Sequence, residues 1–210
     1  GSGNATVVND AGLNFAASTV GGALNATATT GNMTDSGALA ITGTSSFTTS
    51  ASNATITLNT TTNAFTGAVT ITTNDNSADG STDADVTIDG GTTALVLATS
   101  TIDGDLTVRS GNASGITDSG TVTVGGNLAA TTDANNGAIN LGTLAVGGTV
   151  ALTTHGSGNA TVVNDEDLNF AASTVGGNLA AIATTGNMTD SGTVTVGGNL
   201  AAITDANNGV

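Results

Sequence analysis

The stretch Thr117–Ala130 reads TDSGTVTVGGNLAA, and the same letters return at Thr189–Ala202. A second pair of copies is spaced differently, because GSGNATVVND at Gly1–Asp10 returns at Gly156–Asp165. Each core position of a globular enzyme has unique neighbours, whereas each unit of a solenoid meets only the units before and after it. The copies therefore predict an architecture of stacked repeats.

A shorter unit lies inside the long copies, and its anchor is a glycine with an apolar residue two positions earlier. Five of the seven steps between anchors span about 21–24 residues, which suits one turn of chain around an axis. The other two steps, from Gly67 to Gly104 and from Gly148 to Gly177, are longer. We interpret them as a loop insertion or irregular coil near residues 74–92 and an enlarged coil near 155–170. The anchors are Gly22, Gly43, Gly67, Gly104, Gly126, Gly148, Gly177 and Gly198.

Apolar residues alternate with polar ones on both sides of each anchor. In TVTVGGNLAA the apolar Val122, Val124 and Leu128 share one parity, while Thr121 and Thr123 have the other. Such alternation in short segments indicates strands, and no segment shows a helical period over three turns. Because the same residue types recur at the same phase, units should stack in register and in parallel. The expected fold is one all-β parallel β-helix, or β-solenoid, over residues 1–210, with about nine coils and a length of about 40–45 Å.

The repeat phase gives expectations for single residues. Val124, Val146, Val175 and Val196 each lie two positions before an anchor glycine, so we expect them to form one inward ladder. The anchor glycines should have positive φ or be crowded by the neighbouring coil.

Two further patterns concern outward and corner positions. Ile182 and Ile203 fall on the outward parity, so they should be more exposed than Leu179 and Leu200. The Asp and Ser of the recurring DSG corners at Asp35, Asp118 and Asp190 should bind backbone groups at turns.

Composition excludes several classes of function. The net charge is −15 with Arg109 as the one Lys or Arg, so the chain lacks the cations that nucleic acid or anionic membrane surfaces require. No apolar run is long enough for a membrane-spanning helix. Hydrophobic residues make up 38% of the chain, which is too apolar for ordinary disorder, while aromatics make up 2%, too few for a wide globular core.

Catalytic and metal sites find little support in the sequence. His155 is the one histidine and has no nucleophile constellation around it, so it is expected to be an exposed corner residue and the chain not an enzyme. Asp75, Asp79, Asp83 and Asp85 are candidate ligands for a Ca²⁺ site, because oxygen ligands at short spacing can chelate the ion. They match neither an EF-hand loop nor a Ca²⁺-binding nonapeptide repeat, which favours a solvated loop and no required cofactor.

A flat face of threonine triplets is the pattern that orders water against ice. Such triplets occur at Thr27–Thr29, Thr55–Thr57, Thr70–Thr72, Thr121–Thr123 and Thr193–Thr195. An ice-binding face needs one triplet at one phase in every coil. These triplets lie before the anchor in some coils and after it in others, so outward residues of ordinary strands are favoured.

The TVTVGGNLAA, DSG and LNFAAS elements resemble the repeat shafts of large secreted bacterial β-solenoid proteins, the filamentous-haemagglutinin-like adhesins and their β-strand-repeat relatives. The resemblance implies a right-handed parallel β-helix at the cell surface or outside the cell, acting in adhesion, biofilm or surface-fibre assembly. Such proteins carry a secretion-recognition domain that these residues do not include. Both ends of the sequence read as internal units, which indicates a segment of a longer chain.

The expected function is therefore structural, as an extracellular shaft or filament segment. The expected partners are further coils at its ends, from the same chain or another copy, and host or cell-surface glycans. The alternative is a ligand-binding solenoid that recognises ice or carbohydrate through its Thr and Asn residues. Thermal hysteresis would separate an ice-binding face from a shaft.

Overall fold

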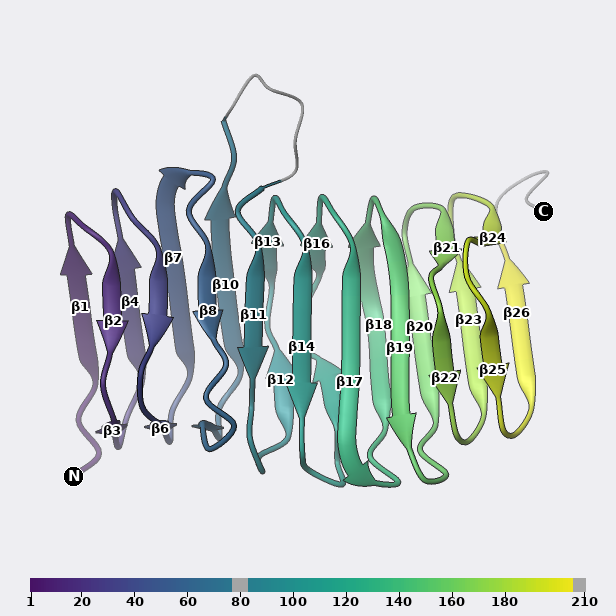
Figure 1. Ribbon diagram of the computed structural model, residues 1–210, viewed down its shortest axis with the longest axis horizontal. Helices are drawn as coiled ribbons and strands as arrows, with labels where there is room; N and C mark the ends of the chain where they lie inside the picture. The colour runs from purple at the N-terminus through teal and green to yellow at the C-terminus, as the bar shows by residue number, and fades with distance from the viewer. Residues whose placement is uncertain (77–82, 206–210) are drawn as a thin grey trace.

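The computed structural model describes residues 1–76 and 83–205, and these form a rod of stacked strands without a helix (Figure 1). The chain makes about nine turns of about 21 residues, and all paired strands run parallel. The predicted β-solenoid is confirmed. Strands of the near wall descend in Figure 1 while those of the far wall ascend as the chain advances from left to right, which makes the coil right-handed.

Two walls enclose the core. The first is a twelve-stranded sheet, here called sheet A, and the second is an eleven-stranded sheet, sheet B. A three-stranded sheet, sheet C, continues sheet B in the first three turns. Each turn consists of two half-turns, one on each wall. A straight half-turn is a single strand, and a bent half-turn is two short strands on either side of a bend.

The chain divides into three blocks according to which wall is bent. In the first block sheet A is straight and the opposite wall is bent. Sheet A holds β1 (Ala5–Asn9), β4 (Leu24–Ala28), β7 (Ser45–Ser52) and β10 (Val69–Asn74). The bent half-turns are β2 (Leu13–Phe15) with β3 (Ser18–Val20), β5 (Met33–Asp35) with β6 (Leu39–Ile41), and β8 (Ile56–Leu58) with β9 (Ala64–Phe65).

In the middle block the walls exchange roles. Sheet B is straight, with β11 (Val86–Asp89), β14 (Leu106–Ser110), β17 (Leu128–Asn135) and β19 (Thr149–His155). Sheet A holds the bent pairs β12 (Leu95–Leu97) with β13 (Ser100–Ile102) and β15 (Ile116–Asp118) with β16 (Val122–Val124). The next half-turn on sheet A, β18 (Ile139–Val146), is also bent although its two parts form one continuous strand: the first part pairs with β15, the second with β16, and the register shifts between Leu141 and Leu144.

The last block returns to the first arrangement. Sheet A is straight again, with β20 (Ala160–Asn164), β23 (Leu179–Ala183) and β26 (Leu200–Thr204). Sheet B holds the bent pairs β21 (Leu168–Phe170) with β22 (Ser173–Val175) and β24 (Met188–Asp190) with β25 (Val194–Val196).

Each exchange of roles occurs where two straight half-turns follow one another, at β10–β11 and at β19–β20. These are the two longer anchor steps, Gly67 to Gly104 and Gly148 to Gly177. The interpretation of the second step as an enlarged coil is wrong, because the chain adds a straight half-turn there instead. The first step also adds a straight half-turn, and residues 77–82 of the insertion predicted there lie outside the described residues.

As a result, identical sequences occupy opposite walls. The first TDSGTVTVGGNLAA lies on sheet A at β15 and β16 and crosses to sheet B at β17. Its copy lies on sheet B at β24 and β25 and crosses to sheet A at β26. The two GSGNATVVND copies, in contrast, lie on the same wall: their strands β1 and β20 both belong to sheet A, seven strand pairings apart.

The core is the narrow space between the walls. Most inward residues are fully buried aliphatic side chains stacked one turn above another, and outward residues alternate with them. Two phenylalanines fill the first block, with the rings of Phe47 and Phe65 edge to face at 5.8 Å. Small and branched side chains suffice elsewhere because the walls lie close together.

The predicted single valine ladder is wrong. Val124 pairs with Val146 on sheet A, whereas Val175 pairs with Val196 on sheet B. The side chains of the first three are buried, and that of Val196 is half-buried against the core. Their inward parity therefore holds, but the exchange at β19–β20 places the two pairs on opposite walls.

The exposure prediction holds for one pair of residues and fails for the other. Ile182 is half-buried and Leu179 is buried, as expected. Leu200, however, is 58% exposed against 48% for Ile203. Both lie on β26, the last strand described in sheet A, where no described strand of a following turn covers the inward side chain.

Candidate functional surfaces

The anchor glycines are required by crowding. A Cβ at Gly126 would lie 2.9 Å from the carbonyl carbon of Gly104 and closer still to the Asp105 carboxylate. The other anchors meet backbone or Asx side chains of the preceding turn in the same way. None of them has positive φ; the described glycines with positive φ are Gly91, Gly115 and Gly156. Of the two alternatives predicted for the anchor glycines, crowding by the neighbouring coil is therefore confirmed.

The crowding atom belongs to a ladder of Asn and Asp residues, here called the Asx ladder, that sequence reasoning missed. The Asp105 carboxylate accepts a hydrogen bond from the backbone N–H of Asn127 at 2.6 Å, and the Asn127 side chain accepts one from Thr149 N–H at 2.8 Å. Asn178 and Asn199 repeat the arrangement at 2.8 Å. Each side chain passes the next anchor glycine to reach that N–H group. The available signal was the Asn directly after GG.

The DSG corners bind turns on both sides. Asp118 accepts hydrogen bonds from the N–H groups of Gly142 at 3.0 Å and Thr143 at 2.7 Å, one turn ahead. Ser119 donates to the Leu97 carbonyl, one turn behind, at 3.4 Å. Asp35 binds forward in the same way, to Asn59 and Thr60. Capping of backbone groups is thus confirmed at these two corners, but the bonds join different turns.

Buried hydroxyls complete the hydrogen bonding where a bent half-turn stacks on a straight one. Ser100 accepts from Ile71 N–H at 3.0 Å on sheet A, and Ser173 accepts from Leu152 N–H at 3.1 Å on sheet B. Both serines are 3% exposed. The bend removes the carbonyl that a straight strand would offer, so the hydroxyl takes its place.

An amide and a hydroxyl serve the opposite junctions, where a straight half-turn follows a bent one. The buried Asn164 side chain accepts from Val146 N–H at 2.8 Å and donates to the Val146 carbonyl at 3.0 Å, as a peptide group would. At the first exchange, Thr93 accepts from Phe65 N–H at 3.2 Å.

Arg109 lies between two acids of neighbouring turns on sheet B. Its guanidinium donates to the Asp133 carboxylate and lies 4.0 Å from that of Asp89. Burial raises the pKa of the Asp89 carboxyl above its ordinary value, although Gly91 N–H donates to that carboxyl at 2.7 Å. The Asp133 carboxylate raises the pKa of Arg109. The chain's one Arg is therefore paired with carboxylates of the rod itself.

The catalytic and metal candidates do not form a site within residues 1–76 and 83–205. His155 is exposed at the end of β19. Asp85 accepts from Asp105 N–H at 2.8 Å, and Asp75 accepts from the Ser52 hydroxyl at 3.2 Å. Asp83 also has an interaction partner, and Asp79 lies outside the described residues. No group of three metal-ligating side chains occurs in the described part of the chain.

Because the walls exchange roles, threonines before the anchor in one turn and after it in another can lie on the same face, which the sequence argument had excluded. Thr72 follows its anchor and Thr123 precedes its own, yet both lie in one outward ladder of sheet A. That ladder runs through consecutive turns as Thr27, Thr48, Thr72, Thr101 and Thr123. The bend between β12 and β13 interrupts the neighbouring outward row of sheet A. The threonines therefore form one row and not the two adjacent rows that triplets would give.

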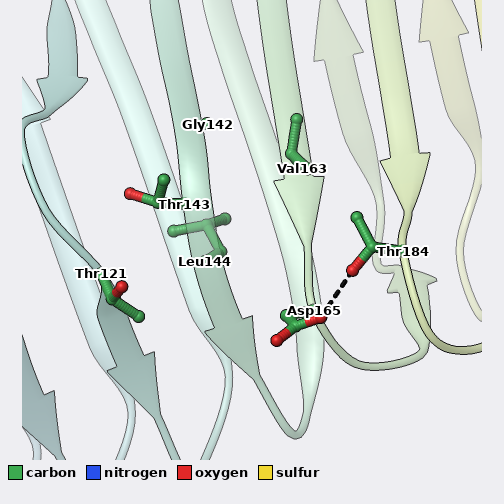
Figure 2. Close-up of a pocket in the computed structure, with 7 residues that line it drawn as sticks. All are labelled: Thr121, Gly142, Thr143, Leu144, Val163, Asp165 and Thr184. Atoms are coloured by element: carbon green, nitrogen blue, oxygen red, sulfur yellow. Dashed lines mark hydrogen bonds between the residues drawn. The ribbon is translucent and has the colours of Figure 1, made fainter.

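A shallow depression marks the second exchange on sheet A (Figure 2). Its volume is about 270 Å³. Gly142, Leu144 and Val163 line it together with polar Thr121, Thr143, Asp165 and Thr184. The Thr184 hydroxyl donates to the Asp165 carboxylate at 2.6 Å. The lining offers hydroxyls and one carboxylate, without the base and nucleophile pair that hydrolysis by a side chain would need.

Three segments of the chain, residues 2–72, 83–141 and 157–210, match the family described as repeats of unknown function (DUF5649). The chain belongs to this family. The two gaps between the matched segments, 73–82 and 142–156, each end just before the second straight half-turn of an exchange, β11 and β20 respectively.

No curated protein and no solved structure matches the chain. In the described residues no helix has the length and apolar character needed to cross a membrane.

Proposed function

We propose that this DUF5649 chain is a shaft segment of an extracellular filament or adhesin and acts as a rigid spacer. The observation that carries the proposal is the clamping of each turn to its neighbours. Backbone ladders, the Asx ladder and the DSG corners all bind along the rod axis. A stack of this kind resists extension without needing a wide core.

Charge and resemblance support the same role. A net charge of −15 opposes sideways clumping of rods at low salt. The resemblance to secreted repeat shafts supports a location at the cell surface, with adhesion, biofilm or surface-fibre assembly as the setting. Further coils at either end, from the same chain or another copy, are part of this proposal. The role requires neither a cofactor nor catalysis.

The two TDSGTVTVGGNLAA copies allow a direct test of the spacer role. Deleting residues 117–188 joins identical sequences, and seven half-turns are lost between the two copies. We expect a folded rod that is shorter by about 17 Å, which scattering and atomic force microscopy can measure. Deleting 127–188 instead places two bent half-turns in succession, an order that the described chain never uses, and should destabilise the rod.

Location is tested separately on the native source. Gold-labelled antibody against the chain should mark extended material outside the cell envelope in electron micrographs. Label confined to the cell interior, or an unchanged rod length after the deletion of 117–188, would refute the shaft. Sedimentation of the isolated chain tests association through its ends.

A further inference from the structure

The last block carries a shallow trough on the outer surface of sheet A. Its volume is about 330 Å³. The floor consists of Thr161, Ala180 and Ala201, which pair with one another on consecutive strands β20, β23 and β26. Small side chains make this row the lowest part of the outer surface, and the trough follows the rod axis from turn to turn.

One wall of the trough is a row of amide donors. Asn159, Asn178 and Asn199 line it, and the side-chain oxygens of the first two accept backbone hydrogen bonds at 2.8 Å from the following turn. Those bonds fix the orientation of the amides. Their Nδ2 groups make no hydrogen bond to any described residue, and all three side chains are exposed. The wall therefore presents two oriented N–H donors, from Asn159 and Asn178, and the Asn199 amide follows them at the same interval of about 4.8 Å.

An apolar ladder lies beside the trough, on the side away from the asparagines. Val163, Ile182 and Ile203 form an outward ladder two residues further along the same strands. Ile203 is 48% exposed. A ligand in the trough would thus touch amide donors on one side and branched aliphatic side chains on the other.

The same sequence on the other wall lacks these features. In the VGGNLAA copy at Val124–Ala130 the Asn127 Nδ2 donates to the Asp105 carboxylate at 3.1 Å. The adjoining row runs from Asp89 through Arg109, Thr131 and Thr153. There the donor is occupied and the surroundings are charged, so the trough is a property of the last block and its position on sheet A.

The chemistry of the lining selects a class of ligand. No residue that lines the trough is charged, while the protein as a whole carries −15. A polyanion would be repelled, and a cation would find no carboxylate in the lining. A neutral molecule with hydroxyl acceptors and an apolar ring face would satisfy both sides. The donor interval is also close to the length of one sugar residue in an extended β-linked chain.

We propose that the trough binds a neutral β-linked polysaccharide lying along the rod. The apolar faces of its sugar rings would rest on Ala180, Ala201 and the Val163–Ile203 ladder, and its hydroxyls would accept hydrogen bonds from the three Asn side chains. This site goes beyond the shaft role, since it lets the side of the rod bind a glycan chain.

The test uses the whole chain and three solid probes: amorphous cellulose, chitin and alginate. We expect depletion of the protein onto cellulose or chitin but not onto the anionic alginate. Ala180→Phe fills the trough from an outward position and should lower the bound fraction about tenfold. The matched control is Ala129→Phe, in the same VGGNLAA sequence on sheet B, and it should bind like the unmodified chain.

A second variant separates binding from folding. Asn178→Asp keeps the oxygen that accepts from Asn199 N–H and removes the Nδ2 donor, so it should fold normally and bind weakly. The proposal is overturned if neither neutral glycan retains the chain, if alginate retains it equally, or if Ala129→Phe loses binding as Ala180→Phe does. Any of these results leaves the measured rod length, and hence the shaft, untouched.

Discussion

Replacement of Gly126 by alanine tests the reason for the anchor glycines. A Cβ at this position would lie 2.9 Å from both the carbonyl carbon and the oxygen of Gly104, and closer to the Asp105 carboxylate. The backbone of the preceding turn can move little because strands hold it on both sides. Forcing extra atoms into such a site costs about 1–3 kcal/mol.

The substitution also disturbs the Asx ladder. To avoid the new methyl group, the Asp105 side chain must leave Asn127 N–H, which it now binds at 2.6 Å. An exposed hydrogen bond of this kind contributes about 1 kcal/mol. The two effects together predict a loss of about 2–4 kcal/mol in the free energy of unfolding.

Gly142→Ala is the matched control. Its added Cβ would meet one atom within 4 Å, the Asp118 Oδ1 at 3.9 Å, and its φ is not positive. We expect a neutral effect or a gain of about 0.4–1 kcal/mol through the unfolded chain. Urea unfolding followed by circular dichroism measures both variants, and hydrogen exchange at Asn127 N–H reports the ladder. Equal stability of the two variants would refute the steric argument.

Four further predictions concern the exchanges, the buried acid and the metal. The exchange at β19–β20 predicts that Thr153→Cys with Thr174→Cys forms a disulfide, whereas Ala145→Cys with Thr174→Cys, the pair a single ladder would bring together, does not. Mass spectrometry of the oxidised chains decides this, and the reverse pattern contradicts the wall assignment. Ser173→Ala should cost about 1–3 kcal/mol by leaving Leu152 N–H without an acceptor. Ser191→Ala should change denaturant stability by less than about 0.5 kcal/mol, because the Phe170 carbonyl that its hydroxyl reaches at 3.3 Å still accepts from Ser191 N–H at 2.8 Å. Because burial raises the folded pKa of Asp89, its stabilising contribution is complete below the unfolded pKa and is lost as pH rises through the folded value. Asp89→Asn should therefore gain stability relative to the unmodified chain at pH 7 and not at acid pH, and the same difference at both pH values would contradict this. Melting curves with and without excess chelator should coincide, whereas a drop of many degrees would make the acidic residues ligands.

Part of the candidate trough was within reach of sequence reasoning. The outward parity of Ile182 and the recurrence of Asn after GG are both visible in VGGNLAA. What could not be predicted is that Asn178 keeps its Nδ2 free while Asn127 donates to Asp105. That difference depends on which residue occupies the same corner one turn earlier, and hence on the stacking.

The sequence by itself determined the type of fold and the inward set of residues. Alternation of apolar and polar residues is a local property of a strand, and the anchor spacing sets the length of a turn, so both could be inferred without coordinates. The tertiary structure alone decided which wall each unit occupies. That choice depends on how many half-turns precede the unit, and the added straight half-turns at β11 and β20 change the count. For this reason Val146 and Val175, which look equivalent in the sequence, lie on opposite walls, and Thr72 and Thr123, which look unlike, stack on one.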